Sequence, residues 1–541
     1  MQYASPRQAI FLLAVVAALI GWVWYGLGRP VAMPPSPLAA GEKIPCLSYT
    51  PFRGLQSPLD DAVAGRAAIE DDLKRISRIS GCVLTYAATH GLEHVPEIAR
   101  GLGLTVIQGI WLSRDAARNR AEVESAIALA RRYPGVIRAI VAGNEVFLRG
   151  EMNPEALAPV IARVKSAAGV PVTYAETWEY WLQNRELAAA VDFVTIHVLP
   201  YGEDFPVPAA ETAARVVDVQ RRVAANFPGK EVFVGEAGWP SAGRMREGAL
   251  PSASNQARVV HDLLAAAKRF GFRLSIPEAF DQPWRQHVEG TAGGHWGWMT
   301  AGTREPKFRL GAPVSDHPLW LYEGLAGILL AVATFAAASA SGRTVPGAPP
   351  IDWFKIAGVA LLGGVVAGWA IVDTVIESVL ISTWIYSGLL LIAVLLAPPL
   401  VAAALARGTP APGFGTLLDP AEWRAADRVG RAAALLLGLT VVLAIHAALG
   451  LVFDPRLRDF PFAPLTGPAA AFAALAFSNA RARPTAGIAE YAAAALLGAS
   501  AAYIALSESP ENWQALWFCA GLAVLAAACA RLGSAPGGRS S

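Results

Sequence analysis

Charged residues are scarce in this sequence. Only 16% of its 541 residues are Asp, Glu, Lys or Arg, 54% are hydrophobic, and the formal net charge is +2. An ordinary soluble domain carries about 25% charged residues, so this composition predicts several membrane spans beside a soluble region. No Lys/Arg-rich tract with interleaved aromatic residues is present, and we therefore expect no nucleic-acid binding.

Cysteine is also rare, with four in the whole chain. The cysteines show no spacing with histidine that is typical of a metal site, so we expect no metal and no cofactor. Cys519 and Cys529 lie in an apolar run, where they are expected to fill space. Cys46 and Cys82 stand at corresponding places in two successive predicted strands. A disulfide between them would require an oxidising compartment, and the sequence leaves this pairing open.

Long hydrophobic runs, by contrast, are abundant. Residues 9–27 form an uninterrupted apolar run close to the length of about 20 residues that crosses a bilayer. The apolar core of a signal peptide is shorter, about 7–15 residues, so residues 1–28 are predicted to be a retained transmembrane anchor rather than a cleaved signal. Residues 29–43, which include a proline-rich stretch, are predicted to be a linker.

The C-terminal part, residues 319–532, is predicted to be an all-α membrane domain of about seven helices, followed by a cytoplasmic tail at 533–541. The candidate spans are 320–340, 356–374, 379–404, 432–453, 463–479, 486–507 and 513–530. They contain few ionisable residues, which favours an anchor or a docking region over a transporter.

The distribution of Lys and Arg predicts the orientation in the membrane. With a cytoplasmic N-terminus, the short external loops contain only Arg456 and Arg458. The cytoplasmic segments contain Arg7, Arg343, Lys355, Arg407, Arg424, Arg428, Arg431, Arg481, Arg483, Arg531 and Arg539. This asymmetry follows the positive-inside rule and predicts that residues 41–318 lie on the outer side of the membrane.

Residues 41–310 alternate between strand-like and helix-like segments. The strand-like segments are 46–52, 82–88, 104–112, 137–145, 171–178, 192–200, 231–239 and 273–284. Asp115 and Asn153 stand where helix N-caps are expected. The alternation predicts a parallel α/β sheet, and eight units suit a (β/α)₈ barrel over residues 44–312. An open doubly wound sheet is the alternative, but the Gly-rich turn that would hold a nucleotide is missing.

Two of these strands stop at a glutamate, Glu145 in VAGNEV and Glu236 in VFVGEAGWPS. Strand ends of such a barrel meet on one face, where active sites lie. A pair of carboxylates at that face is suited to acid/base and nucleophilic chemistry on a glycosidic bond. Polar and aromatic residues gather at the same ends: Tyr86, Gln108, Trp111, Asn144, Glu176, Trp178, His197, Tyr201, Trp239, Glu278, Asp281 and Trp284.

The two glutamate motifs resemble the signatures of glycoside hydrolase family 17, the β-1,3-glucanases and β-1,3-glucanosyltransferases. The strings TYAETWEYW, DFVTIHVLPYGED and EAFDQPWRQHVEGTAGGHWGW resemble the bacterial membrane-bound branch associated with periplasmic β-1,3/β-1,6-glucan synthesis. The resemblance covers about residues 44 to 310, half of the chain. It implies a multi-pass protein of the bacterial inner membrane whose barrel lies in the periplasm.

The resemblance also implies catalytic roles. Glu145 takes the place of the family's general acid/base, Glu236 that of the nucleophile, and Asn144 that of the neighbour that binds the substrate 2-hydroxyl. The family mechanism is retaining, which implies carboxyl groups about 5 Å apart. An ionised Glu236 is expected to raise the pKa of Glu145, so that Glu145 begins the reaction protonated.

A further set of residues is predicted to bind the substrate: Tyr86, Glu176, Trp178, His197, Tyr201, Trp239, Glu278, Asp281, Gln282, Trp284 and Arg285. Structural alternatives stay open for them, since buried carboxylates can support the catalytic pair and aromatic rings at a barrel rim can simply pack. One departure from the family stands out: where many members have a second Glu and a Lys after the eighth strand, this chain has Gln282 and Arg285.

Three functional hypotheses follow. The leading one is a membrane-anchored transglycosylase that elongates, branches through β-1,6 linkages or cyclises β-1,3-glucan. The second is a β-1,3-glucanase that uses the same site, and the third is a non-catalytic glucan-binding export scaffold. The motifs of nucleotide-sugar-dependent glycosyltransferases, D-x-D and Q-x-x-R-W, are absent. A separate membrane glucan synthase is therefore the implied partner, beside the glucan and the lipid bilayer.

Overall fold

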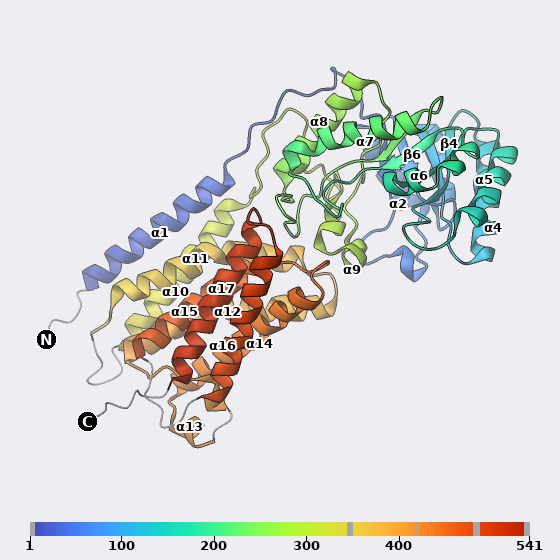
Figure 1. Cartoon of the computed structure of the whole chain (residues 1–541). Helices are drawn as coiled ribbons and strands as arrows, with labels where there is room; N and C mark the ends of the chain where they lie inside the picture. Colours follow the sequence, from blue (N-terminus) through green and yellow to red (C-terminus); the bar gives the residue numbers. More distant parts are fainter. Residues whose placement is uncertain (1–5, 343–349, 418–419, 480–486, 535–541) are drawn as a thin grey trace. The chain divides into compact units, whose positions relative to one another are not determined.

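The computed structural model of this chain describes residues 6–342, 350–417, 420–479 and 487–534 (Figure 1). The chain divides into two compact units. The barrel unit is Val31–Val314, and the helical unit combines the chain up to Pro30 with the chain from Ser315 onward. Several predicted features lie outside the described residues: most of the tail at 533–541, and Arg343, Arg481, Arg483 and Arg539.

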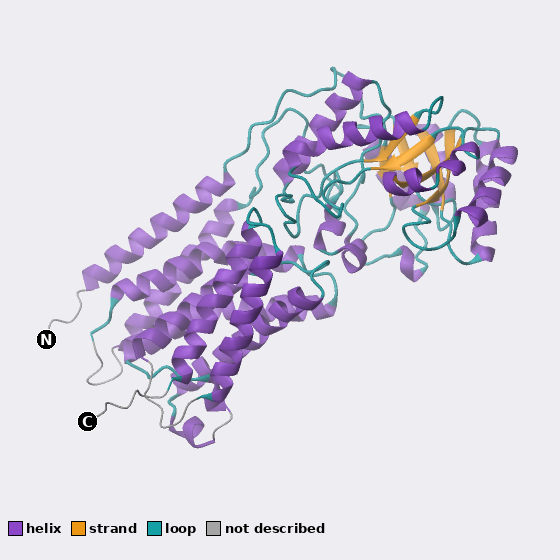
Figure 2. Ribbon diagram, in the orientation of Figure 1, coloured by secondary structure: helices purple, strands orange, loops and turns teal. Residues whose placement is uncertain are grey.

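Parallel strands form the centre of the barrel unit. Seven strands join in the order β1-β2-β3-β4-β5-β6-β7, so that each lies beside its neighbour in sequence. They are β1 (Leu47–Tyr49), β2 (Cys82–Thr85), β3 (Thr105–Ile110), β4 (Ile137–Asn144), β5 (Val172–Thr177), β6 (Val194–His197) and β7 (Val232–Glu236). Figure 2 shows them as one curled sheet with helices around it, which confirms the predicted α/β barrel fold.

The predicted eighth strand is present only as a short bridging segment. Leu274 pairs with Val234 of β7, and Ile276 pairs with Leu47 of β1, both in parallel orientation. The segment therefore closes the sheet between its first and last strands without forming a regular strand. Pro277 follows directly, and a proline has no backbone N–H with which to continue the pairing.

Helices alternate with these strands along the chain. The α-helices of the barrel unit are α2 (Arg66–Ile76), α3 (Val95–Leu102), α4 (Ala116–Arg132), α5 (Pro154–Ala168), α6 (Trp178–Gln183), α7 (Thr212–Asn226), α8 (Ala253–Phe270) and α9 (Gln286–Glu289). Short 3₁₀ helices are η1 (Pro58–Asp60), η2 (Leu92–His94), η3 (Arg185–Ala189), η4 (Ala209–Glu211), η5 (Pro283–Arg285) and η6 (Thr291–His295). The predicted N-caps are confirmed: Asp115 accepts a hydrogen bond from the first turn of α4, and Asn153 from that of α5.

Both faces of the sheet are buried, which explains why the strands are nearly continuous apolar runs. One face packs against the surrounding helices in the main hydrophobic core. The other face contributes a smaller cluster inside the barrel: Cys46, Cys82, Leu84, Ile107, Ala139, Val141, Ala175, Phe193 and Phe233. The predicted active-site face is at the carboxyl ends of the strands, beyond this inner cluster.

A buried ion cluster connects β1, α2 and the loop at position 304. The Asp72 carboxylate is fully buried and accepts hydrogen bonds from the Tyr49 hydroxyl at 3.0 Å and from Arg304 Nε at 3.1 Å. Arg53 and a second nitrogen of Arg304 also contact it. The Arg304 guanidinium lies 3.7 Å from the centre of the Phe280 ring. The buried carboxylate therefore balances the buried Arg304 and contacts Arg53, which is partly exposed.

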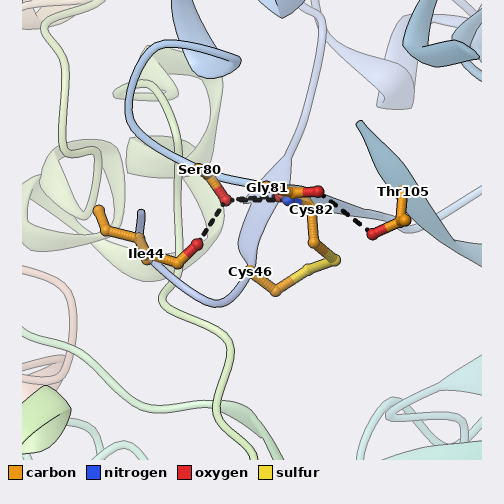
Figure 3. The surroundings of a disulfide bond; sticks show 6 residues. All are labelled: Ile44, Cys46, Ser80, Gly81, Cys82 and Thr105. Carbon is orange, nitrogen blue, oxygen red and sulfur yellow. Dashed lines mark hydrogen bonds between the residues drawn. A yellow bond between two sulfur atoms is a disulfide. The ribbon is translucent and has the colours of Figure 1, made fainter. Parts of the chain in front are cut away.

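Cys46 and Cys82 form a disulfide, the pairing that the sequence left open (Figure 3). Cys46 directly precedes β1, and Cys82 is the first residue of β2. The Ser80 hydroxyl beside it donates hydrogen bonds to the carbonyl oxygens of Ile44 and Cys82, at 3.1 Å and 2.8 Å. Both half-cystines belong to the cluster inside the barrel. The disulfide therefore joins the first two strands at the end opposite the active-site face.

Removing this disulfide is expected to destabilise the barrel. The bond closes a loop with a sequence separation of 36 residues, and loop-closure entropy predicts a loss of about 4 kcal/mol. We expect Cys46→Ala/Cys82→Ala to unfold at a lower temperature than the native chain in detergent, followed by near-ultraviolet circular dichroism. Cys519→Ala is the control, because Cys519 is a free cysteine. An unfolding temperature equal to that of the native chain would contradict the prediction.

The helical unit consists of long apolar helices. In the described part of the chain, seven are long and apolar enough to cross a membrane. They are α1 (Pro6–Gly28), α10 (Trp320–Gly342), α11 (Trp353–Ile376), α12 (Ile381–Arg407), α14 (Arg428–Phe453), α16 (Ile488–Ser507) and α17 (Trp513–Gly533). The short helices η7 (Phe414–Leu417) and α13 (Pro420–Ala425) precede α14.

The remaining predicted span, 463–479, is a helix but a shorter one, α15 (Phe462–Asn479). Its apolar part, Phe462–Ser478, does not exceed 17 residues and extends about 25 Å, less than the hydrocarbon thickness of about 30 Å. Most of its side chains are buried in a cluster shared with α12, α14 and α17. The count of full-length spans in the described residues is thus one lower than the sequence predicted.

Candidate active site

Glu145 directly follows β4 in an uncommon backbone conformation. Its φ is 50° and that of Gly143 is 105°, so the chain turns sharply where the strand ends. The Glu145 N–H donates to the Ala175 carbonyl of β5 at 2.8 Å. The next two N–H groups, of Val146 and Phe147, donate to the Tyr174 hydroxyl. A left-handed conformation at a non-glycine residue costs free energy, and these contacts from β5 hold it in place.

Glu236 is the last residue of β7 and is 4% exposed. It pairs with His197 at the end of β6, after a register shift between Ile196 and His197. The Tyr86 hydroxyl, just beyond β2, donates a 2.5 Å hydrogen bond to Glu236 Oε1. A donor fixed on one oxygen orients the carboxylate and leaves the other oxygen for contact with a substrate.

His197 lies between the two glutamates. Its Nδ1 is 2.8 Å from Glu145 Oε1 and 4.0 Å from Glu236 Oε2. One ligand atom from each of the three side chains lies within 4.8 Å of the others. In the described part of the chain this is the one group with the spacing to hold a metal ion. A metal there would compete for the atoms of the hydrogen bond between His197 and Glu145.

The His197 ring needs the space beside Gly235 of β7. A Cβ atom at position 235 would lie 2.5 Å from the Thr195 methyl and 3.3 Å from the His197 ring. A side chain at this position would therefore clash with Thr195 and press on the edge of the imidazole. The first glycine in the motif GEAGWPS is thus explained by Thr195 and His197 on the neighbouring strand.

The charges of the three groups depend on one another. Burial favours neutral His197, but the charge of Glu236 and the hydrogen bond to Glu145 outweigh it and raise the pKa of His197 to about 9. Burial likewise raises the pKa of Glu145, but the hydrogen bond and charge of His197 outweigh this and hold the pKa below its ordinary value. The expectation of a raised pKa at Glu145 is therefore wrong for the free protein, because the sequence did not place His197 between the carboxylates.

This pair is expected to make barrel stability depend on pH. The pKa of His197 rises from 6.5 to about 9, so its contribution is complete below 6.5 and is lost as pH rises through 9. The pKa of Glu145 is lowered from 4.5, so its contribution is lost as pH falls. The unfolding temperature of the native chain should fall between about pH 7 and pH 10 more steeply than that of His197→Asn. Parallel curves for the two proteins would contradict this.

Glu278 and Arg285 complete the charged surroundings of the pair. Burial raises the pKa of Glu278 to about 7; the charge of Arg285 opposes this shift and that of Glu236 adds to it. The Thr50 hydroxyl donates to Glu278 Oε1 at 3.0 Å, and Arg285 Nη1 lies 3.9 Å from the same oxygen. The positive charge of Arg285 also acts on Glu145 and Glu236.

Three other predicted substrate-binding residues have protein partners. Glu176 is fully buried and accepts hydrogen bonds from the Tyr174 hydroxyl and from the N–H groups of Phe147 and Leu148. Asp281 contacts Lys307 at 2.7 Å and accepts the Gly297 N–H. Gln282 donates to the Thr50 carbonyl and accepts from the Trp284 indole. The structure thus places them in support of the loops, and their contact with substrate stays a prediction.

The aromatic candidates are largely enclosed as well. Trp239 is 1% exposed and donates to the Leu250 carbonyl, and Tyr201 is 7% exposed and donates to that of Arg244. Trp178 is 9% exposed and is covered by two arginines of α7. The half-buried Trp284 is tied to Gln282. Asn144, 8% exposed, ends β4 beside Glu145.

Sequence reasoning missed Thr50 and Glu289. Thr50 follows β1 and orients Glu278 through its hydroxyl. Glu289 lies 3.5 Å from Arg285 Nε, one helical turn later in the chain. Glu289 thus places a carboxylate in the segment after the eighth strand, where this chain has Gln282 in place of the second Glu of the family. The spacing of Arg285 and Glu289 by four residues was a visible signal for this pair.

Comparison with known proteins relates the barrel to glycoside hydrolases. Residues 46–297 match the BtgE/BtgC glycoside hydrolase domain. A glucan 1,3-beta-glucosidase of Arthroderma benhamiae is 26% identical over 282 residues, which cover 48% of this chain and 90% of that protein. The glucan 1,3-beta-glucosidase of Saccharomyces cerevisiae is 22% identical, with 43% and 81% covered. A probable beta-glucosidase btgE of Neosartorya fischeri is 28% identical over 216 residues, which cover 38% of this chain and 38% of that protein.

Among solved structures, an active-site mutant of the Rhizomucor miehei beta-1,3-glucanosyltransferase in complex with laminaritriose is similar, with a TM-score of 0.44 and 21% identity. The match covers 50% of this chain and 97% of that one.

The family match contains every strand of the barrel and both glutamates at the ends of β4 and β7. Residues 46–297 of this chain therefore form a glycoside hydrolase domain that is similar to the BtgE/BtgC family and to glucan 1,3-beta-glucosidases, with glycosidase or transglycosylase activity.

Proposed function

We propose that this protein is a membrane-anchored, retaining transglycosylase that acts on β-1,3-glucan. The observation that carries the proposal is the separation of Glu145 and Glu236, whose carboxylate oxygens approach within 4.8 Å. This spacing is close to the roughly 5 Å of retaining glycosidases and below the roughly 6.5–9.5 Å of inverting ones, and it therefore supports a double-displacement mechanism. Relatives named glucan 1,3-beta-glucosidase support the substrate class.

In the first step, Glu236 attacks the anomeric carbon while Glu145 protonates the glycosidic oxygen. The bond from that carbon to the leaving oxygen breaks, and an ester to Glu236 forms. In the resting site the required proton lies on His197. It reaches Glu145 Oε1 through the 2.8 Å hydrogen bond, which leaves His197 neutral. His197 would therefore supply the proton that the low pKa of Glu145 withholds in the free protein.

In the second step, Glu145 acts as a base. It takes the proton of an acceptor hydroxyl, whose oxygen attacks the anomeric carbon and releases Glu236. A sugar hydroxyl as acceptor gives a longer, branched or cyclic glucan, and water gives hydrolysis. Tyr86 would position Glu236 throughout, and Asn144 would bind the 2-hydroxyl of the reacting sugar.

The membrane part of the proposal rests on the helical unit. Seven apolar helices of spanning length support a multi-pass protein, with 1–28 as an anchor and 319–532 as a membrane domain. The excess of Lys and Arg on one side favours a barrel outside the cytoplasm, in the periplasm of a bacterium. The disulfide between Cys46 and Cys82 agrees with an oxidising compartment. A separate synthase would supply the glucan.

Transfer and hydrolysis differ in their products. Full-length protein in detergent, incubated with laminaripentaose, is expected to form oligosaccharides longer than the substrate at early times. Mass spectrometry of the products measures their length, and nuclear magnetic resonance identifies the linkage formed. If only shorter products appear at every substrate concentration, the protein is a β-1,3-glucanase that uses the same site.

A further inference from the structure

Trp111 differs from the other aromatic residues at the active-site face. Its side chain is 39% exposed, whereas Trp178, Tyr201 and Trp239 are buried. It follows β3, and its backbone N–H donates to Glu122 Oε2 of α4 at 3.0 Å, which fixes its position. A large indole held in place with an open surface is unusual, because an isolated tryptophan gains free energy from burial.

One face of this indole is already occupied. The Arg149 guanidinium lies 4.0 Å from the centre of the Trp111 ring. Arg149 is itself immobilised, since it donates to the Asn144 carbonyl at 2.9 Å and 3.1 Å and to the Leu112 carbonyl at 2.8 Å. Trp111 therefore cannot turn away from solvent without breaking a cation–π contact. Its remaining surface is a preformed flat platform.

The register of β3 and β4 places this platform beside the catalytic pair. Gly109 pairs with Val141 and Ile110 with Ala142. Continued by one residue, this register places Trp111 beside Gly143, two residues before Glu145. Strands lie about 4.8 Å apart and rise about 3.3 Å per residue. Since Ile107 lies in the cluster inside the barrel, the two-residue repeat directs Trp111 to the same side, toward the centre of the active-site face.

We propose that Trp111, backed by Arg149, is a sugar-binding subsite that stacks on a glucosyl unit of β-1,3-glucan next to the units cleaved at Glu145 and Glu236. This inference rests on the proposed function for the identity of the ligand. The axial C–H groups of a pyranose ring match a flat aromatic face, and a ring already held by an arginine loses little conformational entropy on binding. The subsite therefore favours long glucan chains over short ones.

The test compares substrate lengths. We expect Trp111→Ala in the full-length protein to lower kcat/KM for laminarihexaose about fivefold to tenfold, with little change for laminaribiose. Trp111→Phe, which keeps an aromatic face, should recover most of the loss. In the Glu236→Gln background, Trp111→Ala should weaken the binding of laminarihexaose by the same factor by which it lowers kcat/KM.

Phe270→Ala is the matched control. Phe270 is 42% exposed and has the Arg221 guanidinium 4.6 Å from its ring centre, but it ends α8, at the opposite end of the barrel. It should leave kcat/KM unchanged at every length. If the native chain acts on β-1,3-glucan but Trp111→Ala has the same kcat/KM for laminarihexaose as Phe270→Ala, the subsite is overturned and the proposed function is not. A native chain without activity on any β-1,3-gluco-oligosaccharide would overturn the proposed function and, with it, this ligand.

Discussion

Replacing Glu236 by Gln is expected to lower kcat/KM for β-1,3-glucan by at least about 10³-fold, because the amide cannot form the glycosyl ester. Glu145→Gln should cause a loss of about 10² to 10⁴-fold, the usual contribution of a general acid. The loss should be smaller for substrates with a good leaving group, which need no protonation. Initial rates of the full-length protein in detergent measure both effects.

The roles of the two glutamates can be separated with azide. Glu145→Ala leaves the nucleophile intact, so azide should attack the glycosyl-enzyme and yield a β-glycosyl azide from an activated β-glucoside. Glu236→Ala leaves space for azide to displace the leaving group directly, which gives the α-anomer. Identical anomers from both variants would mean that the two roles are assigned wrongly.

The control for these variants is Glu231→Gln. Glu231 directly precedes β7, the strand that Glu236 ends, and is half exposed beside Arg273. Its replacement should leave activity unchanged. If Glu236→Gln behaves like this control in product formation, the third hypothesis, a non-catalytic glucan scaffold, becomes the better description.

Asp72→Asn is expected to destabilise the barrel unit by about 3–5 kcal/mol, because it leaves a buried charge uncompensated. Arg304 is only 5% exposed, and the amide of Asn cannot balance the charges of Arg304 and Arg53. Chemical unfolding of the full-length protein, followed by tryptophan fluorescence, measures the change. The variant should otherwise keep its secondary structure.

The neighbouring residue offers a matched control. Asp71 contacts the same Arg53 at 2.9 Å, but its side chain is 46% exposed. Asp71→Asn should therefore cost at most about 1 kcal/mol, as is usual for an exposed ion pair. Equal effects at positions 71 and 72 would show that burial does not decide the contribution of this cluster.

The sequence predicted the barrel because its signals are local. Apolar runs with both faces buried, N-caps at Asp115 and Asn153, and glutamates at strand ends each depend on a few adjacent residues. The eighth strand was predicted too long, because Pro277 interrupts a run that hydropathy alone extends. The span at α15 was counted in full because composition does not reveal that a helix is short and enclosed by others.

The site shows the same division. By itself the sequence determined which residues were predicted to be catalytic, since Glu145 and Glu236 stand at strand ends in two specific motifs. Only the tertiary structure showed what surrounds them, because His197 comes from a third strand and lies between the two carboxylates, which raise its pKa. It also directed Trp178 and Trp239 into the protein and left Trp111 open. Side-chain burial and charge depend on residues distant in sequence, and no local pattern contains that information.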